Sequence, residues 1–220
     1  MVKIDEIIRS NRKTLSVRIS PLGKLTVRAP LRCNEERIFA FLRDKEAWIT
    51  KHLQKTVGAG TKIPTDNLDG FSFLLLGKTH TVTLVDGKKV GYDSENLRLL
   101  VPKDNARERL VKWLKENAKR IFTAVTAQTA TQMETTYKSV AITSAKTRWG
   151  SCSADNSLRY TFRLIYAPKE VVRYVVVHEL AHTRYKNHSA LFWREVERYE
   201  PDYKKWRKWL KDNAVLMEIF

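Results

Sequence analysis

The sequence predicts an α+β protein in which strands dominate the first hundred residues and helices dominate the rest. Two observations support this class. Short runs of alternating polarity fill much of residues 15–101, and a long helical periodicity begins at Asp104. Because the pattern changes there, we expect an N-terminal region at 1–102 and a second domain at 103–220.

The N-terminal region begins with a predicted β-hairpin. Apolar and polar side chains alternate over residues 15–19 and 25–29, around the turn sequence Ser-Pro-Leu-Gly, and Pro30 ends the second strand. Asn34 is expected to cap a helix, because two glutamates fill the next turn and an apolar stripe follows. Three further strand-like runs are expected after a Gly- and Pro-containing joint, at residues 71–76, 79–85 and 97–101.

The second domain is predicted to contain a long helix over residues 104–133, where apolar side chains recur at helical spacing. Two strand-like runs follow, at 139–143 and 158–164. Pro168 marks the start of the next helix, since proline is favoured in the first turn. A further helix is expected to run toward Tyr199.

The helix after Pro168 contains His178, Glu179 and His182 in the arrangement H-E-x-x-H. Positions i and i+4 share one helix face, so the two imidazoles can reach a single ion while the glutamate lies beside them. This arrangement is typical of zinc hydrolases, in which the glutamate is the general base. Three valines precede the motif, and a carboxylate buried among them needs a partner, which a water molecule held by the metal would supply.

A catalytic zinc ion takes three protein ligands, so one more remains to be found. His188 is the nearest candidate, and Glu195 on the following helix ranks below it. Six residues of continuous helix would turn the His188 ring away from the other two, so the helix must end first. Tyr185 stands where zinc proteases of similar spacing bend at a glycine, and Asn187 is expected to end the helix in a left-handed conformation.

Further segments accompany the histidine motif: Arg148-Trp149-Gly150-Ser151-Cys152-Ser153, Ala167-Pro168, and Asn187-His188-Ser189 with Phe192-Trp193. Together with the N-terminal hairpin, these segments resemble the YgjP-like metallopeptidase family, which is similar to the SprT and WLM zinc peptidases. The resemblance covers nearly the whole chain. It implies a zincin-like catalytic domain, with helices packed on a small, mostly antiparallel sheet, and a strand-rich N-terminal extension.

The resemblance also implies His178, His182 and His188 as ligands of Zn²⁺ and Glu179 as the general base. The expected activity is the cleavage of a peptide or protein substrate by zinc-activated water. The run Leu158 to Leu164 is expected to pair with the substrate as a strand, and Tyr185 and Arg148 are candidate donors to the oxyanion. Cys152 is interpreted as a packed residue, with a thiol that blocks the zinc as the alternative.

Two other functions stay open. Some members of the family carry a UTP pyrophosphatase assignment, and the net charge of +17 suits a triphosphate, although the chain has no G-x-x-x-x-G-K-[ST] loop. The same charge, from 41 Lys and Arg against 24 Asp and Glu, also favours polyanions, so a nucleic-acid-associated SprT-like protease is the further alternative.

The ends and apolar runs of the sequence bear on location. Acidic residues stand where a signal peptide would be basic, and no run reaches about eighteen apolar residues. We therefore expect a cytoplasmic protein with no membrane segment. In that compartment Cys33 and Cys152 are expected to be reduced.

Overall fold

The computed structural model describes residues 4–19, 25–50, 63–64 and 67–218. By its internal contacts, the chain divides into two compact units, 1–61 and 62–220. This division differs from the expected boundary after residue 102. The strands that follow residue 70 belong with the second unit, for a reason found in their contacts.

The N-terminal unit is a three-stranded sheet with one helix. Its strand order is β1-β3-β2, with β1 parallel and β2 antiparallel to β3, so the predicted hairpin strands are confirmed, while their turn lies outside the described residues. The Asn34 side chain accepts a hydrogen bond from the Arg37 N–H at 3.1 Å, which confirms the predicted helix cap. The elements are β1 (Glu6–Ser10), β2 (Ser16–Ile19), β3 (Leu25–Pro30) and α1 (Glu35–Asp44).

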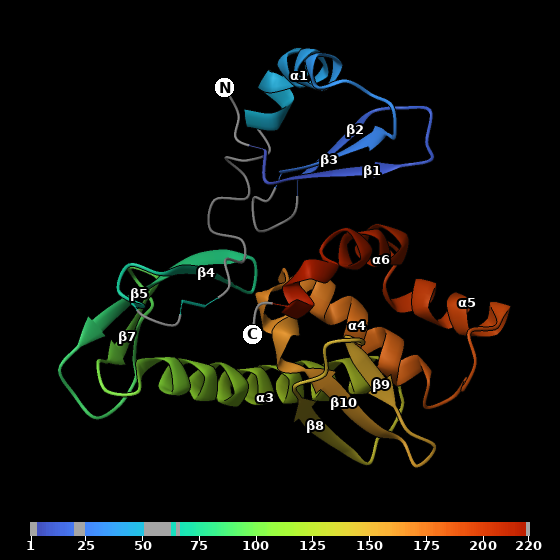
Figure 1. The fold of residues 1–220 in the computed structure, drawn as a ribbon. Helices are drawn as coiled ribbons and strands as arrows, with labels where there is room; N and C mark the ends of the chain where they lie inside the picture. Colours follow the sequence, from blue (N-terminus) through green and yellow to red (C-terminus); the bar gives the residue numbers. More distant parts are fainter. Residues whose placement is uncertain (1–3, 20–24, 51–62, 65–66, 219–220) are drawn as a thin grey trace. The chain divides into compact units, whose positions relative to one another are not determined.

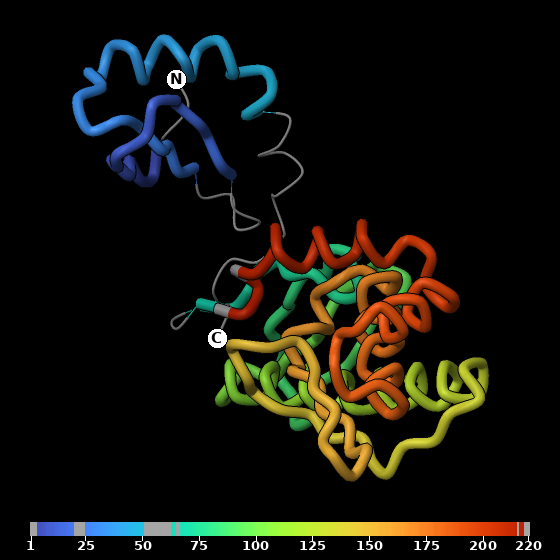
Figure 2. The backbone as a smooth tube through the Cα atoms, turned by 90° about the vertical axis from the view of Figure 1, so that its right-hand side faces the viewer, coloured from blue at the N-terminus to red at the C-terminus, as the bar shows by residue number. Residues whose placement is uncertain are grey.

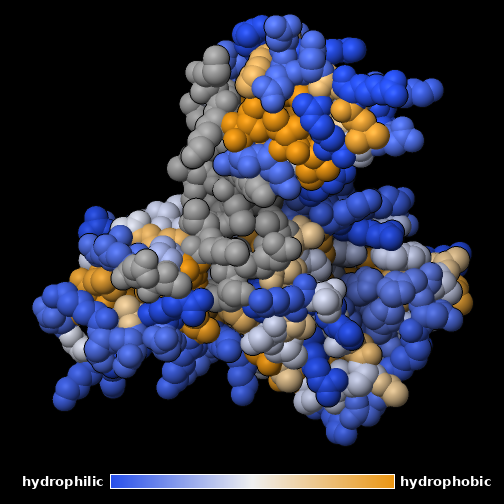
Figure 3. Space-filling model, viewed as in Figure 1, coloured by the Kyte–Doolittle hydropathy of each residue, from blue (hydrophilic) through white to orange (hydrophobic). Residues whose placement is uncertain are grey.

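The described core of this unit is a cluster of apolar side chains and one cysteine. Its buried members are Leu25, Val27, Ala29, Cys33, Ile38, Leu42 and Ile49. All five residues of β1 are exposed, and Figure 3 shows apolar side chains at the surface of the unit. The strand β1 was not predicted, because a fully exposed strand has no alternation for the sequence to display.

The second unit is organised along the long helix α3 (Ala106–Gln132), which confirms the predicted helix (Figure 1). A four-stranded sheet of order β4-β5-β7-β6 precedes it and a three-stranded sheet of order β8-β10-β9 follows it. The strands are β4 (Ser72–Leu75), β5 (Lys78–Val85), β6 (Gly91–Asp93), β7 (Arg98–Pro102), β8 (Ser139–Thr143), β9 (Gly150–Cys152) and β10 (Ser157–Thr161).

The four-stranded sheet is tied to the second unit at its β4–β5 turn. The Leu76 N–H donates to the Ile165 carbonyl at 2.8 Å, within the 3₁₀ helix η1 (Phe162–Tyr166). Gly77, whose φ is +77°, lies so close to Pro168 that a Cβ would stand 3.1 Å from the proline Cα. These contacts with the chain before the histidine motif explain why residues 62–102 pack with the second unit.

The sheet β8-β10-β9 is mixed, whereas a mostly antiparallel sheet was expected. β10 pairs in parallel with β8 and antiparallel with β9, because the chain crosses from β8 to the far edge before β10 returns between them. The run 158–164 is therefore a central strand for its first half only. From Phe162 onward it is the buried 3₁₀ helix η1.

The helix with the histidine motif lies between α3 on one side and α6 on the other, as both ribbon and tube show (Figures 1 and 2). It also packs against α5 and β9, so it is apolar on nearly every side. Pro168 is its N-cap residue. The helical elements are α4 (Lys169–Ala181), α5 (Ala190–Tyr199), α6 (Tyr203–Asp212) and the 3₁₀ helix η2 (Ala214–Glu218).

Within the described part of the chain, no helix is both long and apolar enough to cross a membrane.

Candidate metal centre and active site

Three histidine rings meet at the end of α4. The nearest ligand atoms of His178, His182 and His188 all lie within 4.8 Å of one another. The Nε2 atoms of His178 and His188 are 3.1 Å apart, and the ring centroids of His182 and His188 are 4.7 Å apart. The structure thus brings together the three histidines that the sequence analysis proposed as ligands.

The helix ends earlier than expected. Its last residue is Ala181, His182 is the C-cap, and the Tyr185 N–H still bonds to the Ala181 carbonyl at 2.9 Å. Asn187 is not among the described residues with a left-handed φ, so the predicted helix end at Asn187 is wrong. A turn directly after His182 replaces the glycine bend.

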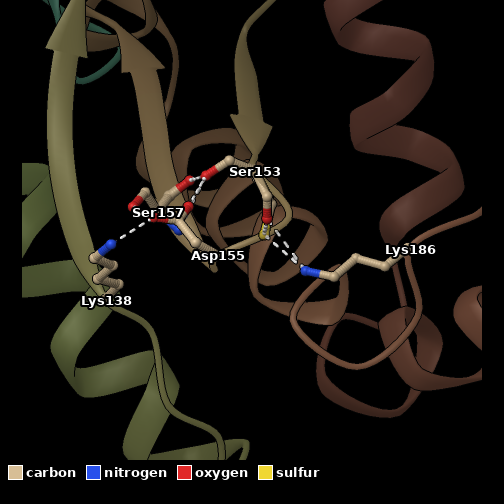
Figure 4. A network of polar contacts seen from close by, with 6 residues as sticks. Lys138, Ser153, Asp155, Ser157 and Lys186 are labelled. Atoms are coloured by element: carbon tan, nitrogen blue, oxygen red, sulfur yellow. Dashed lines mark hydrogen bonds and ion pairs between the residues drawn. The ribbon is translucent and has the colours of Figure 1, made fainter.

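Two cations hold the loop that carries His188. Arg184 donates to the carbonyls of Met133 and Glu134, at 2.9 and 2.6 Å, just beyond the end of α3. Lys186 reaches the β9–β10 turn, where it donates to the Ser153 carbonyl at 3.2 Å (Figure 4). It also donates to the Asn156 side chain. Both anchors are distant in sequence, so the path of this loop depends on the packed fold.

The β9–β10 turn is itself rigid. Asp155 accepts hydrogen bonds from Ser153 at 2.6 Å and from Ser157 at 3.1 Å, and it pairs with Lys138 at 2.7 Å (Figure 4). These bonds hold the pKa of Asp155 well below its usual range, chiefly through Lys138 and Ser153. Lys186 therefore binds a turn that is held by its own hydrogen bonds, and this contact fixes the path of the loop that carries His188.

Aromatic side chains of α5 pack against the three histidine rings. The Phe192 ring centroid lies 4.4 to 4.9 Å from those of the three imidazoles. Trp193 stacks on His188 at 5.6 Å and in turn stacks on Tyr203 at 5.2 Å. Ser189 accepts the Phe192 N–H at the start of α5, which places both aromatic side chains under the site.

The protonation of the histidines suits metal binding. Burial, followed by the neighbouring His182, His188 and Arg207, lowers the pKa of His178 to about 3, and burial also lowers the pKa of His182. Both rings are therefore neutral at pH 7, the form that binds a metal. His182 Nδ1 lies 2.9 Å from the Tyr185 carbonyl, which leaves Nε2 with a lone pair toward the other rings.

The donor set fits a metal ion on three grounds. The Nε2 atoms of His178 and His188 face each other at 3.1 Å, close enough for one cation to bind both. The His178 Nδ1 atom is buried and has no hydrogen-bond partner among the described residues. Three imidazoles with room for a fourth ligand are a set that zinc accepts.

Glu179 is buried beside the histidines, with 5 % of its surface exposed. Burial raises the pKa of Glu179 to about 8, while Arg148 acts in the opposite direction. Within the described residues, no group donates a hydrogen bond to its carboxylate. The side chain packs under Gly150 of β9, where a Cβ would stand 2.6 Å from Glu179 Oε1, so only glycine leaves room for this carboxylate.

Glu179 and His178 open into a cavity of about 380 Å³. Sequence reasoning did not single out Tyr174, Arg207 and Lys211, which also line it. Tyr174 had a detectable signal, because it lies one helical turn before His178 on the same face. Arg207 and Lys211 had no such signal in the sequence, because α6 has the pattern of an ordinary basic amphipathic helix.

Other candidates from the sequence lie elsewhere. Glu195 forms a 2.6 Å ion pair with Arg184 and is not part of the histidine cluster, so it does not complete the ligand set. Cys152 is free, half-buried and outside the cluster. Arg148 lines a neighbouring cavity with Arg159, and Tyr185 contributes its carbonyl to His182.

The expected substrate strand is corrected by the sheet order. β10, over Ser157 to Thr161, is paired on both sides and has no free edge for a peptide. β9 is the edge strand on the side of α4, because it pairs with β10 alone among the described strands.

A histidine trio beside a buried glutamate, on an apolar helix that opens into a cavity, is the arrangement of a metal-dependent hydrolase. The model of the family described as "YgjP-like, metallopeptidase domain" matches residues 13–213. The chain belongs to the YgjP-like family. It is a metallopeptidase, a hydrolase that uses a metal ion and acts on peptides or proteins. The match gives no support to a nucleic-acid partner.

Two solved structures are similar to part of the chain. The metallopeptidase zymogen of Methanocaldococcus jannaschii jannalysin shares 20% identity with a TM-score of 0.35, over 41% of this chain and 95% of that chain. The metallopeptidase zymogen of Pyrococcus abyssi abylysin shares 22% identity with a TM-score of 0.38, over 41% and 92%. A comparison with curated proteins gave no match.

Proposed function

We propose that the protein is a zinc peptidase in which His178, His182 and His188 hold Zn²⁺ and Glu179 is the general base. One observation carries the proposal: three imidazoles converge within 4.8 Å of one another, next to a buried carboxylate that has no hydrogen-bond partner among the described residues. When bound, the ion lowers the pKa of a water molecule and polarises a peptide carbonyl. The other steps belong to the chain's own residues.

Glu179 takes a proton from the attacking water and returns it to the leaving amine. A pKa raised to about 8 by burial suits a carboxylate that must accept and release a proton near neutral pH. The valines around it on α4 exclude bulk water from the carboxylate. Gly150 keeps the space above the carboxylate open toward the cavity.

The peptide adds to the free edge of β9. Backbone groups of Gly150, Ser151 and Cys152 that do not pair with β10 are available to an extended substrate, which would lie directly above Glu179. Strand addition uses main-chain hydrogen bonds, so it places the scissile carbonyl without demanding particular side chains. β9 therefore replaces the run 158–164 in this role.

Tyr174 is our candidate donor to the oxyanion. Its ring contacts that of His178 with centroids 6.0 Å apart, and it lines the same cavity. Burial raises the pKa of Tyr174 to about 12, so the hydroxyl keeps its proton at neutral pH and can donate it as a hydrogen bond. The position fits better than that of Tyr185, whose described contact is through its carbonyl.

The test is metal-dependent hydrolysis by the purified protein. The protein is stripped with a chelator, reloaded with Zn²⁺, Mg²⁺ or Mn²⁺, and assayed on an unstructured protein and on UTP. We expect protein cleavage to vanish on stripping and to return with Zn²⁺, because three imidazoles favour zinc over magnesium. The variant His188→Ala is expected to lose both tight zinc binding and cleavage.

Two results would reject the proposal. Cleavage that survives complete removal of metal would reject the zinc site, and restoration by Mg²⁺ alone would reject zinc as the ion. Hydrolysis of UTP without cleavage of any protein or peptide would replace the proposed activity with the pyrophosphatase alternative.

A further inference from the structure

The cavity beside the histidines is lined by three kinds of side chain: the proposed metal ligand and general base, apolar or aromatic residues, and two cations. One wall is the metal site and the general base, His178 and Glu179. The rest is apolar or aromatic, except for the two cationic side chains of Arg207 and Lys211 from α6. The full lining is Trp149, Gly150, Tyr174, Val175, His178, Glu179, Arg207, Leu210, Lys211 and Ala214.

The two cations are exposed residues of α6 that lie beside its buried Leu210 and line the cavity. Arg207 and Lys211 are four residues apart, so they share one side of α6. The neighbouring lining residues are apolar: Leu210 of α6 and Ala214 at the start of η2. Arg207 and Lys211 instead bring two positive charges to the cavity.

Two of the other basic residues of α6 have an acidic partner, while Lys205 lies over the Trp206 ring and forms no ion pair among the described residues. Lys204 pairs with Glu197 at 3.8 Å, and Lys208 pairs with Asp212 one helical turn away. Among the described residues, neither Arg207 nor Lys211 forms an ion pair. Arg207 lies over the Trp193 ring, 4.9 Å from its centroid, which holds the guanidinium at the cavity mouth.

The position of the cations next to a metal site is electrostatically unfavourable by itself. Arg207 and His178 line the same cavity, so the guanidinium would repel a divalent ion bound at the histidines. Two cations plus a metal ion leave the cavity with excess positive charge. An anionic group that enters the cavity with the substrate would offset this charge.

We propose that this cavity is a specificity pocket for a carboxylate that lies close to the scissile bond of the peptide. The proposal rests on the peptidase function proposed above and names its substrate class. The apolar walls of Trp149, Val175 and Leu210 contact the aliphatic part of the substrate, while Arg207 and Lys211 bind its carboxylate at the rim. Neutral side chains at the same position leave both cations without a partner.

The carboxylate has two sources in a peptide. It belongs to an aspartate or glutamate side chain, which makes the enzyme an endopeptidase with acidic preference, or to the free C-terminus, which makes it a carboxypeptidase. The chemistry recognised by Arg207 and Lys211 is the same in both cases. Peptides with a free or an amidated C-terminus distinguish the two.

Binding is measured first, in a protein that cannot turn over its substrate. Zinc-loaded Glu179→Gln is titrated with peptides that carry Glu, Gln or Lys at one of three positions on either side of a single candidate bond. We expect the Glu peptide to bind about tenfold or more tightly than the Gln peptide at one position, because the contact is a charge-assisted hydrogen bond. The Lys peptide should bind more weakly still.

Charge reversal then identifies the residues. Lys211→Glu in the same background should remove the preference for Glu and improve binding of the Lys peptide. Lys208→Glu, on the same helix but outside the cavity lining, is the matched control and should keep the preference. Arg207→Glu should act like Lys211→Glu, with zinc content checked because Arg207 also contacts Trp193 beneath His188.

The binding measurements either support or overturn the proposed carboxylate pocket. Loss of the Glu preference in Lys211→Glu but not in Lys208→Glu supports it, and dependence on a free C-terminus assigns the carboxylate to the chain end. Equal binding of the Glu, Gln and Lys peptides, or a preference that survives both charge reversals, overturns it. Absence of Glu179-dependent cleavage would instead reject the peptidase proposal, because the binding measurement does not require turnover.

Discussion

The helices α4 and α5 both bury glutamate, but in opposite electrostatic surroundings. Glu195 of α5 and Glu200 at its end are each paired with arginine, Arg184 at 2.6 Å and Arg173 at 3.1 Å. Glu179 of α4 is at least as deeply buried, yet no described group pairs with it. Burial of a carboxylate therefore does not by itself distinguish the proposed general base from the other buried glutamates. The lack of a described partner does, because an unpaired buried carboxylate is retained only at a cost to stability.

The largest effect is expected for Glu179, on the free energy of unfolding of the metal-free protein. The folded-state pKa of Glu179, about 8, lies above the ordinary value of 4.5. A raised carboxyl pKa contributes stability that is fully present below pH 4.5 and is lost as the pH rises through 8. We expect Glu179→Gln to avoid that loss and to be more stable than the wild type at pH 8 by on the order of 2–4 kcal/mol.

Urea unfolding in the presence of a chelator, from pH 4 to pH 9, measures this difference. The two proteins should be equally stable near pH 4 and should diverge as the pH rises. The lowered pKa of His178 acts in both proteins and therefore cancels from the difference. A constant difference across the pH range would show that the Glu179 carboxyl is not perturbed by burial.

Substitution of the paired Glu195 should change the free energy of unfolding in the opposite direction and destabilise the protein. Glu195→Gln removes a charge partner of Arg184, whose guanidinium also holds the carbonyls at the end of α3. We expect a destabilisation of about 1–3 kcal/mol, measured by urea unfolding at pH 7. The exposed Glu197, which pairs with Lys204 at 3.8 Å, is the control, and Glu197→Gln should change stability by less than about 0.5 kcal/mol. Equal effects of the two substitutions would contradict the role of the buried pair.

Glu200, at the end of α5, forms one hydrogen bond to α4 and one to α6. It accepts from Arg173 Nε at 3.1 Å and from Trp206 Nε1 at 3.0 Å. A glutamine keeps one acceptor and loses the charge, so we expect Glu200→Gln to lower the free energy of unfolding by about 1–2 kcal/mol. Thermal unfolding of the zinc-loaded and metal-free proteins should show the same loss, since this residue is away from the metal site. A loss confined to the zinc-loaded form would contradict that separation.

The smallest effect concerns Gly150. A methyl group there would stand 2.6 Å from Glu179 Oε1, so Gly150→Ala should displace the carboxylate without removing it. We expect kcat to fall about tenfold with zinc content unchanged. Gly87→Ala is the control, because nothing lies within 4 Å of its added Cβ. Equal kcat values for the two variants would show that Gly150 does not position Glu179.

Local patterns in the sequence predicted much of the fold and the three histidines. The alternation in residues 15–29, the periodicity of α3 and the H-E-x-x-H spacing each depend on neighbours a few residues apart. The mixed α+β class and the helical position of His178 and His182 follow from them. The family resemblance added His188, whose spacing alone left Glu195 as an alternative.

The parts that were missed depend on contacts between distant residues. After α4 ends at Ala181, Arg184 and Lys186 bind groups 30 to 51 residues away, and no local signal in the sequence shows these contacts. The edge position of β9 depends on strand order, and the position of Arg207 and Lys211 at the cavity depends on how α6 packs on α4. An exposed strand such as β1 leaves no alternation to detect.

The most direct test of the central claim compares zinc content and peptide cleavage in the wild type and in Glu179→Gln. We predict about one zinc ion per chain in both proteins, because the three histidines are unchanged. Cleavage should fall by a factor of about 10²–10⁴ in Glu179→Gln, because the general base is lost. Undiminished cleavage by Glu179→Gln, or a wild-type protein that binds no zinc, would contradict this account.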